Sequence, residues 1–458
     1  MRQFAIEDLA KVIGAAPVES AKGLFAGVSI DSRTIRPGDC FFAVPGDKFD
    51  GHHFLEDAFA KGAACAVVRN DARHHYPPDE TVLMVDDTVK ALGDFAGEYR
   101  RRMSFEVIAI TGSVGKTTAK WIIHHVLSRH FRAVQAPKSF NNNIGVPLTL
   151  FDASVEDQIV VAELGSNHPG EIACLTRIAL PDIAVVTNVH PAHLAGFGSL
   201  QAIAEEKLSI SEGLAHDGVL IINADSDPLV NLCRKKGLDY LSFGMGPTSD
   251  FAATDIAYGA ACSEFAIGGV RVCLPLPGPG NVENALAAWA VCSRFGLTPD
   301  DFATAVRTLP PVPMRAELLH IGTLTVLNDC YNANPASMKN ALSTLAGIDP
   351  ASKRRLVFVC GDMAELGQQS RHFHAELGAL IARSQVQLLL AVGDFAEVTA
   401  QAAQSAAGGR LQTRCLRDAP GLCNNLDKFI ERSDIILVKG SRVAGLEVVV
   451  QRLKELFS

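Results

Sequence analysis

Val107-Ile-Ala-Ile-Thr-Gly-Ser-Val-Gly-Lys-Thr-Thr118 is the stretch that organises the rest of the chain. Its apolar run, Val107 to Ile110, predicts a buried strand, and a helical pattern with apolar residues on one face starts at Lys116. Glycines between a strand and a helix let backbone N–H groups point at phosphate oxygens, and the helix N-terminus adds partial positive charge. The stretch therefore predicts a phosphate-binding loop in an α/β domain.

The loop assigns a role to each of its polar residues. Lys116 would reach the β- and γ-phosphates of a nucleotide, and the hydroxyl of Thr117 would hold Mg²⁺. The pattern is a shortened one, because Ile110 stands where the full pattern has its first glycine. An ordinary glycine-rich turn is the alternative, but the lysine and two threonines favour ATP binding. The predicted nucleotide-binding residues here are Gly112, Ser113, Gly115, Lys116, Thr117 and Thr118.

Length, net charge and cysteine spacing limit the classes of protein to which the chain can belong. Its 458 residues suggest about three domains. A net charge of −8, with no basic run, argues against nucleic-acid binding, and no apolar run approaches the ~20 residues of a membrane span. The first residues are acidic where a signal peptide would be apolar, and the 11 cysteines form no C-x-x-C pair. These features predict a cytoplasmic, monomeric protein with reduced thiols.

The first unit, residues 1–104, reads as a small α/β domain. Strands are expected at 40–44, 63–68 and 81–85, with helices at 53–61 and 90–101. Asp31-Ser32-Arg33 is either turn chemistry alone or part of a site for a phosphorylated, nucleotide-like ligand. Arg33 and Lys48 would supply the charge in that site.

The second unit, residues 105–312, alternates strands with helices, which predicts a mostly parallel sheet. Strands are expected at 107–110, 159–162, 183–187 and 219–222. Ligands bind at the carboxyl ends of such strands. Glu163 and His193 follow two of these strands, so they are predicted to converge with Thr117 around phosphates and Mg²⁺.

Two further segments of the second unit have open readings. Glu205-Glu206-Lys207 lies in an expected helix, 200–214, where its pattern favours a solvated charged face. Asn281 suits the N-cap of a helix that follows it, and Asn amides also suit a purine edge.

A proline-rich linker, Leu309 to Arg315, precedes the third unit, residues 313–458. Strands are expected at 324–327, 356–360, 388–392 and 435–438, interleaved with helices in a Rossmann-like plan. Asp329 and the Lys439-Gly-Ser-Arg442 segment follow two of them. The overall prediction is three α/β domains: a small N-terminal one, a central parallel-sheet P-loop ATPase-like one and a Rossmann-like C-terminal one.

These segments together resemble the Mur ligase family, the ATP-dependent amide ligases of peptidoglycan precursor synthesis. Thr111 to Thr118 resembles the family's ATP loop, Asn188 to His193 its metal segment and Asn281-Val-Glu-Asn284 its adenine segment. Further segments are similar to members that add D-alanyl-D-alanine. These are Phe140 to Thr149, Glu163 to Glu171, His193 to Ser199, Tyr331 to Met338 and Gly361 to Gly367.

The resemblance implies an activity and a set of partners. ATP would phosphorylate the carboxylate of a UDP-N-acetylmuramoyl tripeptide, and the amine of D-Ala-D-Ala would attack the acyl phosphate. Residues 1–104 would bind the UDP substrate, 105–312 ATP and 313–458 the incoming D-Ala-D-Ala. Because ATP contacts would come from two domains, a hinge is expected near Pro310 to Pro313.

The resemblance also assigns residues. Lys116, His193, Lys207 and Arg315 would be catalytic, and Thr117, Glu163, His193 and a carbamylated Lys207 would hold two Mg²⁺ ions. Asn281, Asn284, Arg315 and Asp329 would join the loop in binding ATP. The substrate-binding set would be Ser32, Arg33, Lys48, Asn141, Asn142, Asn332, Asn334, Ser441 and Arg442.

The chain also departs from the family pattern. Gly280 stands where a histidine often precedes the first Asn of the adenine segment, and Met314 stands where glycine commonly precedes the linker arginine. The segment after Arg442 lacks the Met- and Arg-rich continuation of some members. Three alternatives stay open: a ligase for a diamino acid, a ligase for glutamate, and a P-loop kinase or NTPase. The first would carry an Asp-Asn-Pro-Arg-type segment, which this chain does not have.

Overall fold

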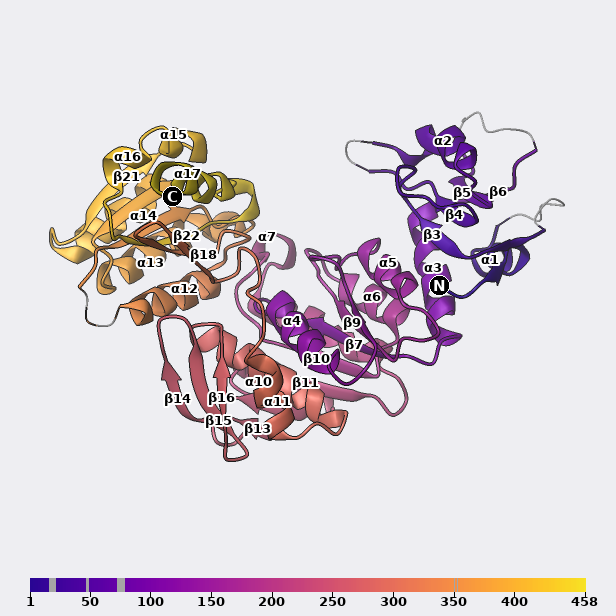
Figure 1. Cartoon of the computed structure of the whole chain (residues 1–458), viewed down its shortest axis with the longest axis horizontal. Coiled ribbons are helices and arrows are strands. Elements are labelled where there is room, and N and C mark those ends of the chain that lie inside the picture. Colours follow the sequence, from indigo (N-terminus) through magenta and orange to yellow (C-terminus); the bar gives the residue numbers. More distant parts are fainter. Residues whose placement is uncertain (16–21, 47–48, 72–78, 350, 352) are drawn as a thin grey trace.

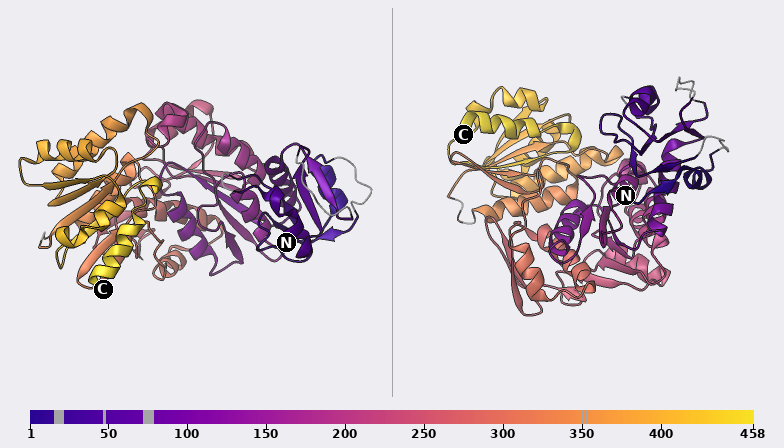
Figure 2. Two further views of the ribbon diagram at one scale, coloured as in Figure 1. Left: turned by 90° about the horizontal axis from the view of Figure 1, so that it is seen from above. Right: turned by 45° about the vertical axis from the view of Figure 1, so that its right-hand side comes forward.

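The computed structural model describes residues 1–15, 22–46, 49–71, 79–349, 351 and 353–458. Three α/β units follow one another along the chain, and the N- and C-terminal units lie at opposite ends of the central one (Figures 1 and 2). The predicted fold class is confirmed. The exact boundaries at 104/105 and 312/313 stay a prediction.

The N-terminal unit contains a parallel sheet of order β3-β4-β5-β6 and a short antiparallel pair, β1 and β2. All three strands expected here are present, with small shifts at their ends. The helix expected at 53–61 begins as a 3-10 turn, Gly51–Phe54. The elements are β1 Phe4–Ala5, α1 Ile6–Val12, β2 Leu24–Phe25, β3 Gly27–Ser29, β4 Asp39–Phe42, α2 Leu55–Ala60, β5 Cys65–Arg69, β6 Val82–Val85 and α3 Thr88–Arg101.

Helix α3 joins the N-terminal unit to the central one by packing on α5 (Gly145–Asp152) and α6 (Glu171–Ala179). Phe95 on α3 stacks on Phe151 of α5 with ring centroids 5.2 Å apart. The hydroxyl of Tyr99 donates to the carbonyl of Ala153 at 2.6 Å, and Arg100 pairs with Asp182 at 2.7 Å. Aromatic packing, a hydrogen bond and an ion pair therefore join the two units.

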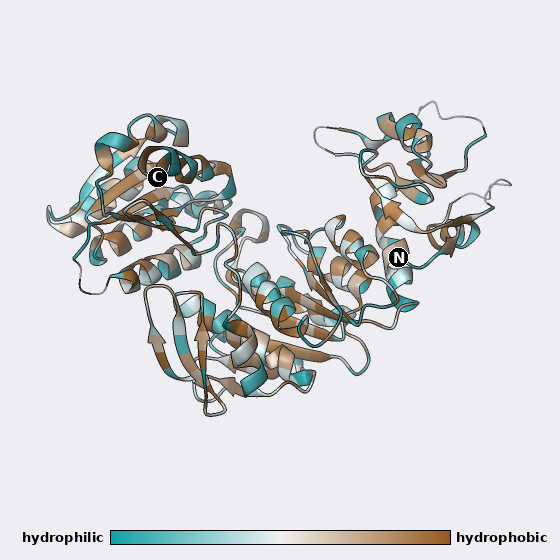
Figure 3. Ribbon diagram, in the orientation of Figure 1, coloured by the Kyte–Doolittle hydropathy of each residue, from teal (hydrophilic) through white to brown (hydrophobic). Residues whose placement is uncertain are grey.

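The central sheet is parallel, with the order β13-β12-β11-β10-β7-β9-β8. The central parts of its middle strands are apolar and buried, as expected of parallel strands covered by helices on both faces (Figure 3). The other elements are β7 Glu106–Thr111, α4 Lys116–Leu127, β8 Ala133–Gln135, β9 Ile159–Glu163, β10 Ile183–Val186, α7 Leu194–Phe197, α8 Leu200–Leu208, β11 Val219–Asn223, α9 Asp227–Lys236, β12 Leu241–Gly244, β13 Phe251–Ala252, α10 Pro279–Arg294 and α11 Pro299–Val306.

A three-stranded antiparallel sheet in the central unit was not predicted. It has the order β14-β15-β16, with bounds Thr254–Tyr258, Ser263–Ile267 and Val270–Leu274. Ser263, Phe265 and Ile267 face inward and alternate with more exposed residues. The strands are short, and Gly268-Gly269 joins the second to the third, so the alternation is too brief to stand out in the sequence.

The C-terminal sheet has the order β17-β18-β22-β19-β20-β21, and only its edge strand β17 is antiparallel to its neighbour. The four predicted strands form its middle, which confirms the Rossmann-like plan. The elements are β17 Glu317–Ile321, β18 Leu324–Asn328, α12 Pro335–Ile348, β19 Leu356–Gly361, α13 Ser370–Arg383, β20 Leu388–Val392, α14 Ala396–Ala407, β21 Gln412–Leu416, α15 Ala419–Cys423, α16 Leu426–Phe429, β22 Ile435–Lys439 and α17 Glu447–Phe457.

Two predictions about class can be compared with the described residues. None of the helices in the described ranges is both long and apolar enough to cross a membrane. None of the 11 cysteines, all of which lie in the described ranges, takes part in a disulfide, and Cys174 and Cys415 are exposed rather than in a core.

Candidate active site

A cavity of about 680 Å³ is lined by the central unit, the linker and the C-terminal unit. It lies at the carboxyl ends of β7, β9 and β10, where ligands bind in such sheets. Most of the predicted site residues meet here. They are Ser113, Gly115, Lys116, Thr117, Thr118, Asn141, Asn142, Glu163, His193, Asn281, Asn284, Arg315, Asp329, Asn332, Asn334, Ser441 and Arg442.

The glycine loop turns tightly between β7 and α4. Gly112 and Gly115 have φ values of 141° and 90°, which favour glycine. A Cβ on Gly115 would collide with the amide of Asn284, so the loop lies directly against the predicted adenine segment. The ammonium of Lys116 donates to the carbonyl of Gly112 at 2.6 Å, and burial lowers the pKa of Lys116. The lysine is therefore held inside the loop that it would serve.

Glu163 lies at the centre of a cluster of polar side chains next to the glycine loop. Thr117 donates to its Oε2 at 2.8 Å, and Asn141 donates to its Oε1 at 2.9 Å. Hydroxyl and carboxylate oxygens are the hard donors that Mg²⁺ prefers, so these residues fit the predicted ion.

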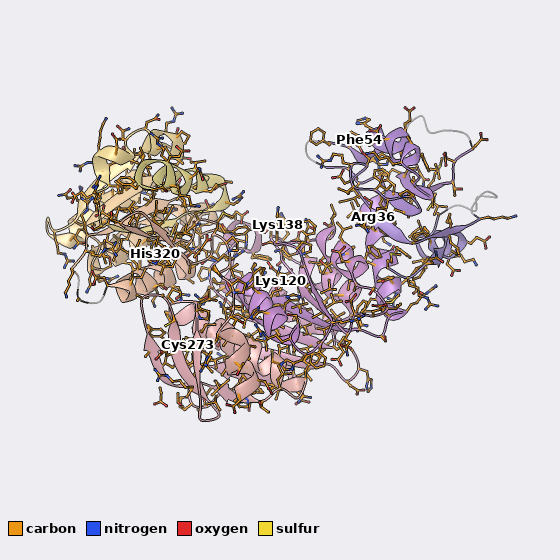
Figure 4. The ribbon with its side chains drawn as sticks, viewed as in Figure 1. Arg36, Phe54, Lys120, Lys138, Cys273 and His320 are labelled. Carbon is orange, nitrogen blue, oxygen red and sulfur yellow. The ribbon has the colours of Figure 1, made fainter. Side chains whose placement is uncertain are left out.

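Lys120 was missed by the sequence analysis. Its ammonium lies 3.8 Å from Glu163 Oε2 and donates to the carbonyls of Ala136, at 2.7 Å, and Lys138. Its side chain is almost fully buried, and Figure 4 labels Lys120 and Lys138 in the central unit. Its spacing of four residues from Lys116 on α4 places both on one helix face, which was the available signal.

Lys207 is 2% exposed, so the solvated charged face favoured for residues 205–207 is wrong for it and for Glu206. Glu206 accepts from the backbone N–H groups of Gly170 and Ile172 at the start of α6. The Lys207 ammonium donates to Ser166 Oγ at 2.6 Å, and Ser166, rather than Lys207, lines the cavity. Burial, followed by the charge of Lys116, lowers the pKa of Lys207 to about 7.

This low pKa makes stability depend on pH. An unfolded lysine has a pKa of about 10.4, so between about pH 7 and pH 10.4 the unfolded state keeps a proton that folded Lys207 has lost. The free energy of unfolding is expected to rise with pH by up to about 1.4 kcal/mol per unit more steeply than in a Lys207→Met variant. Urea denaturation in CO₂-free buffer measures this. Parallel pH curves for the two proteins would contradict a neutral buried amine.

His193 lies at the N-terminus of α7 in the left-handed region, with φ 53°. Its Nδ1 contacts the carboxylate of Glu365 from the C-terminal unit, and this contact lowers the pKa of Glu365. The predicted second metal set, His193 and Lys207, fits Mg²⁺ only if Lys207 gains an oxygen, because an amine is a poor ligand for so hard an ion.

The C-terminal wall of the cavity combines Asp329, Lys439 and Ser441. Asp329 Oδ2 accepts from buried Lys439 at 2.6 Å, and Oδ1 accepts from the backbone of Ala316 at 3.1 Å. Arg315 lies over the ring of Tyr331, 4.2 Å from its centroid. Ser441 is 1% exposed and its hydroxyl has no hydrogen-bond partner in the described part of the chain, so it is available to a ligand.

Several predicted asparagines also have structural roles. The prediction of Asn281 as an N-cap is wrong, because α10 begins earlier, at Pro279, and Asn281 donates back to the carbonyl of Pro277 at 2.8 Å. Asn334 caps α12, and Asn142 accepts from backbone N–H groups at the start of α5. Asn332 accepts from the backbone N–H of the next residue. Cavity position alone therefore does not separate capping from ligand binding.

Gly280 has a structural explanation. A Cβ at this position would lie 2.9 Å from the side-chain nitrogen of Asn340 on α12. A Cβ on neighbouring Gly278 would collide with Thr344 of the same helix. The two glycines let α12 pack directly on the start of α10, where the resembled family often has a histidine.

The predicted residues of the N-terminal unit are not part of this cavity. Arg33 is mostly exposed and its guanidinium pairs with Asp31 at 2.7 Å. The carbonyl of buried Ser32 accepts from Lys61 at 2.7 Å. Lys48 lies outside the described residues. The described residues of the predicted UDP site therefore lie outside the cavity that contains the phosphate loop.

In the described ranges, one group of His, Cys, Asp or Glu side chains is close enough to share an ion: Cys262, Glu264 and Cys273. Glu264 lies on β15, Cys273 on β16 and Cys262 just before β15, all outside the cavity, and Figure 4 labels Cys273. Glu264 already pairs with Arg271.

Comparisons with known proteins cover the whole of this arrangement. Family models match residues 24–100 (Mur ligase family, catalytic domain), 110–292 (Mur ligase middle domain) and 314–442 (Mur ligase, glutamate ligase domain). The chain is 36% identical to the UDP-N-acetylmuramoyl-tripeptide–D-alanyl-D-alanine ligase of Bacillus subtilis, over 94% of this chain and 93% of that protein. A crystal structure of MurF from Acinetobacter baumannii matches with a TM-score of 0.88 at 28% identity, covering 99% of both chains. The MurF ligase of Thermotoga maritima, in complex with ADP, matches at 0.80 and 26%, covering 94% of this chain and 97% of that one.

Proposed function

This chain belongs to the Mur ligase family, and from that we propose that it joins D-alanyl-D-alanine to UDP-N-acetylmuramoyl-tripeptide with ATP. It is an ATP-dependent ligase of peptidoglycan precursor synthesis. The match to relatives of this one specificity runs over nearly the whole chain, which sets aside the kinase, NTPase and other-ligase alternatives. This match is the single observation that carries the proposal, and the cavity shared by the central and C-terminal units agrees with it.

The cavity has the parts that such a reaction needs. A carboxylate cannot lose an oxide ion to an amine, so it must first be activated. A carboxylate oxygen of the tripeptide attacks the γ-phosphorus of ATP and ADP leaves, which forms an acyl phosphate. The nitrogen of D-Ala-D-Ala then attacks the acyl carbon, phosphate leaves, and the amine releases a proton. The protein contributes mainly positioning and charge neutralisation.

Each part has a proposed residue. Lys116 and Arg315 neutralise charge on the transferring phosphoryl group, with Lys116 held in the loop and Arg315 on Tyr331. Asn281 and Asn284 line the cavity and would contact the adenine, and Asp329, on the opposite unit, would contact the ribose. Asn332, Asn334, Ser441 and Arg442 form the wall that the incoming dipeptide would contact, and the free hydroxyl of Ser441 supports this. Ser32, Arg33 and Lys48 are proposed for the UDP end.

Mg²⁺ is part of the proposal. Thr117 and Glu163 would hold one ion, and His193 with carbamylated Lys207 would hold a second. When bound, the ions offset negative charge on the phosphates. Carbamylation needs a neutral amine, and the pKa of about 7 supplies one. The neutral amine forms a bond to the carbon of CO₂ and loses a proton, which gives a carbamate whose anionic oxygen suits the hard ion.

Phosphate release tests the function directly. We expect release from ATP only when both the UDP-muramoyl tripeptide and D-Ala-D-Ala are present, with amide product formed in equal amount. Lysine and diaminopimelate forms of the tripeptide, run side by side, identify the third residue of the peptide. ATP turnover that ignores both substrates would contradict a ligase.

The linker is the proposed hinge. Trp121 of α4 donates to the carbonyl of Pro310 at 3.0 Å, which anchors the central side, while Met314 and Ala316 have φ values of 58° and 49° just beyond it. Binding of an ATP analogue with the UDP substrate is expected to reduce the radius of gyration as the C-terminal unit closes. Small-angle scattering measures this change, and an unchanged scattering curve at saturating ligand would contradict the hinge.

A further inference from the structure

We infer that Glu365 of the C-terminal unit is a positioning residue for His193, and that it makes the second metal site depend on how the C-terminal unit docks. This inference rests on the proposed function, because it concerns His193 as a metal ligand. It concerns a residue from a different unit than the loop, Glu163 and Lys207. The observations are the contact between the two side chains and the backbone around it.

The contact between His193 and Glu365 is supported by backbone contacts between the segments that carry them. His193 Nδ1 meets Glu365 Oε2, and the backbone N–H of Ala195 donates to the carbonyl of Glu365 at 3.0 Å. A Cβ on Gly367 would lie only 3.3 Å from the Cα of Ala195. Helix α7 and the 3-10 turn Gly367–Gln369 therefore meet over a few residues, and Figure 1 shows α7 at the junction of the two units.

Both residues of the pair are held in an uncommon backbone conformation. His193 and Glu365 have φ values of 53° and 62°, in the left-handed region that non-glycine residues rarely adopt. Such conformations persist when the surrounding structure enforces them, and they cluster at functional sites. Here two of them lie on facing segments and bring one imidazole to one carboxylate. Glu365 is 52% exposed, so burial alone does not place it there.

The carboxylate of Glu365 would orient the imidazole of His193 for metal binding. A carboxylate that accepts from Nδ1–H fixes the tautomer and the ring orientation of a histidine, which leaves Nε2 with a lone pair for a metal. His193 lines the cavity, and Nδ1 is occupied, so Nε2 is the nitrogen that remains for an ion.

The two residues come from different units, and this couples metal binding to the docking of the C-terminal unit. His193 belongs to the central unit and Glu365 to the C-terminal unit, on either side of the linker. This contact is separate in sequence from the packing of α12 on Gly278 and Gly280. When the C-terminal unit moves away, His193 loses the partner that orients it. Affinity for the second ion and docking of the C-terminal unit therefore support each other.

Binding of Mn²⁺, used in place of Mg²⁺, tests the inference without turnover. With a non-hydrolysable ATP analogue present, electron paramagnetic resonance should show the weaker of two Mn²⁺ sites losing about 10- to 100-fold in affinity in Glu365→Ala. His193→Gln should weaken the same site, and the double variant should lose little more than His193→Gln alone. Glu376→Ala, which removes an exposed carboxylate on α13 of the same unit, should bind Mn²⁺ as the unmodified chain does.

The tautomer of His193 provides a second readout. In ¹⁵N-histidine-labelled protein, with the His193 signals assigned by their loss in His193→Gln, the ring should be protonated at Nδ1 in the unmodified chain. It should become a tautomer mixture in Glu365→Ala at an unchanged melting temperature. An unaltered Mn²⁺ site together with an unaltered tautomer in Glu365→Ala would overturn the inference. Failure of the proposed function would instead appear as substrate-independent phosphate release by the unmodified chain.

Discussion

Lys116→Met is expected to lower kcat for amide formation by about 10³-fold, the largest loss among single substitutions in the cavity. Methionine keeps the length and apolar stem of the side chain but removes the ammonium, which donates to the carbonyl of Gly112 and would lie beside the phosphates of bound ATP. The loss should fall on kcat more than on the affinity for ATP, because the backbone N–H groups of the loop remain. Steady-state kinetics and ATP-analogue binding measure the two effects.

A matched control separates the ammonium from a general loss of charge. Lys90→Met removes a mostly exposed lysine on α3 that pairs with Asp94, far from the cavity lining. It should leave kcat within about twofold, since exposed ion pairs contribute little. If Lys116→Met keeps most of its kcat, the loop is not the phosphate cradle that we propose.

Lys207→Ala is expected to lower kcat by at least about 10²-fold, because the second ion would lose its oxygen ligand. The alanine leaves a space where the side chain was, and a small carboxylate added to the buffer should fill it. We expect acetate at high concentration to restore part of the activity of Lys207→Ala and none of Lys116→Met. Initial rates against acetate concentration measure the rescue.

Lys207→Arg is the control for the carbamate. Its guanidinium stays protonated and cannot become a carbamate. It should be as inactive as Lys207→Ala and should not respond to acetate, since no space is left. Full activity of Lys207→Arg would contradict the carbamate and would leave Lys207 a packing residue beside Ser166 and Phe197.

The sequence predicted those parts of the fold and site that depend on local patterns. The glycine loop, the buried strands and the residues at strand ends are all read within a dozen neighbouring positions. Glu163 and Asp329 could be placed at one edge of their sheets for this reason, since carboxyl ends of parallel strands share an edge. The antiparallel strands β14 to β16 escaped because they are short and alternate only briefly.

The remaining site residues depend on contacts between distant segments. Glu365 meets His193 across 172 positions, and Lys439 meets Asp329 across 110, so no local pattern predicts either pair. The prediction of a solvated charged face was wrong for Lys207, because residues that are distant in the sequence pack around its side chain and bury it. Asn142 and Asn334 show the converse, since their capping contacts are local but the sequence analysis considered them only as substrate-binding residues.

Helix α3 has a consequence for which peptides the protein accepts. It fixes the N-terminal unit on the central one through Phe95, Tyr99 and Arg100, so the span from the proposed UDP site to the glycine loop is set by packing. The fixed span would then set how far a substrate held at its UDP end can reach toward the glycine loop. A tripeptide would bring its terminal carboxylate to the γ-phosphate, while a peptide one residue shorter would stop before it. Chain length, rather than recognition of every side chain, would thereby decide which precursor is extended.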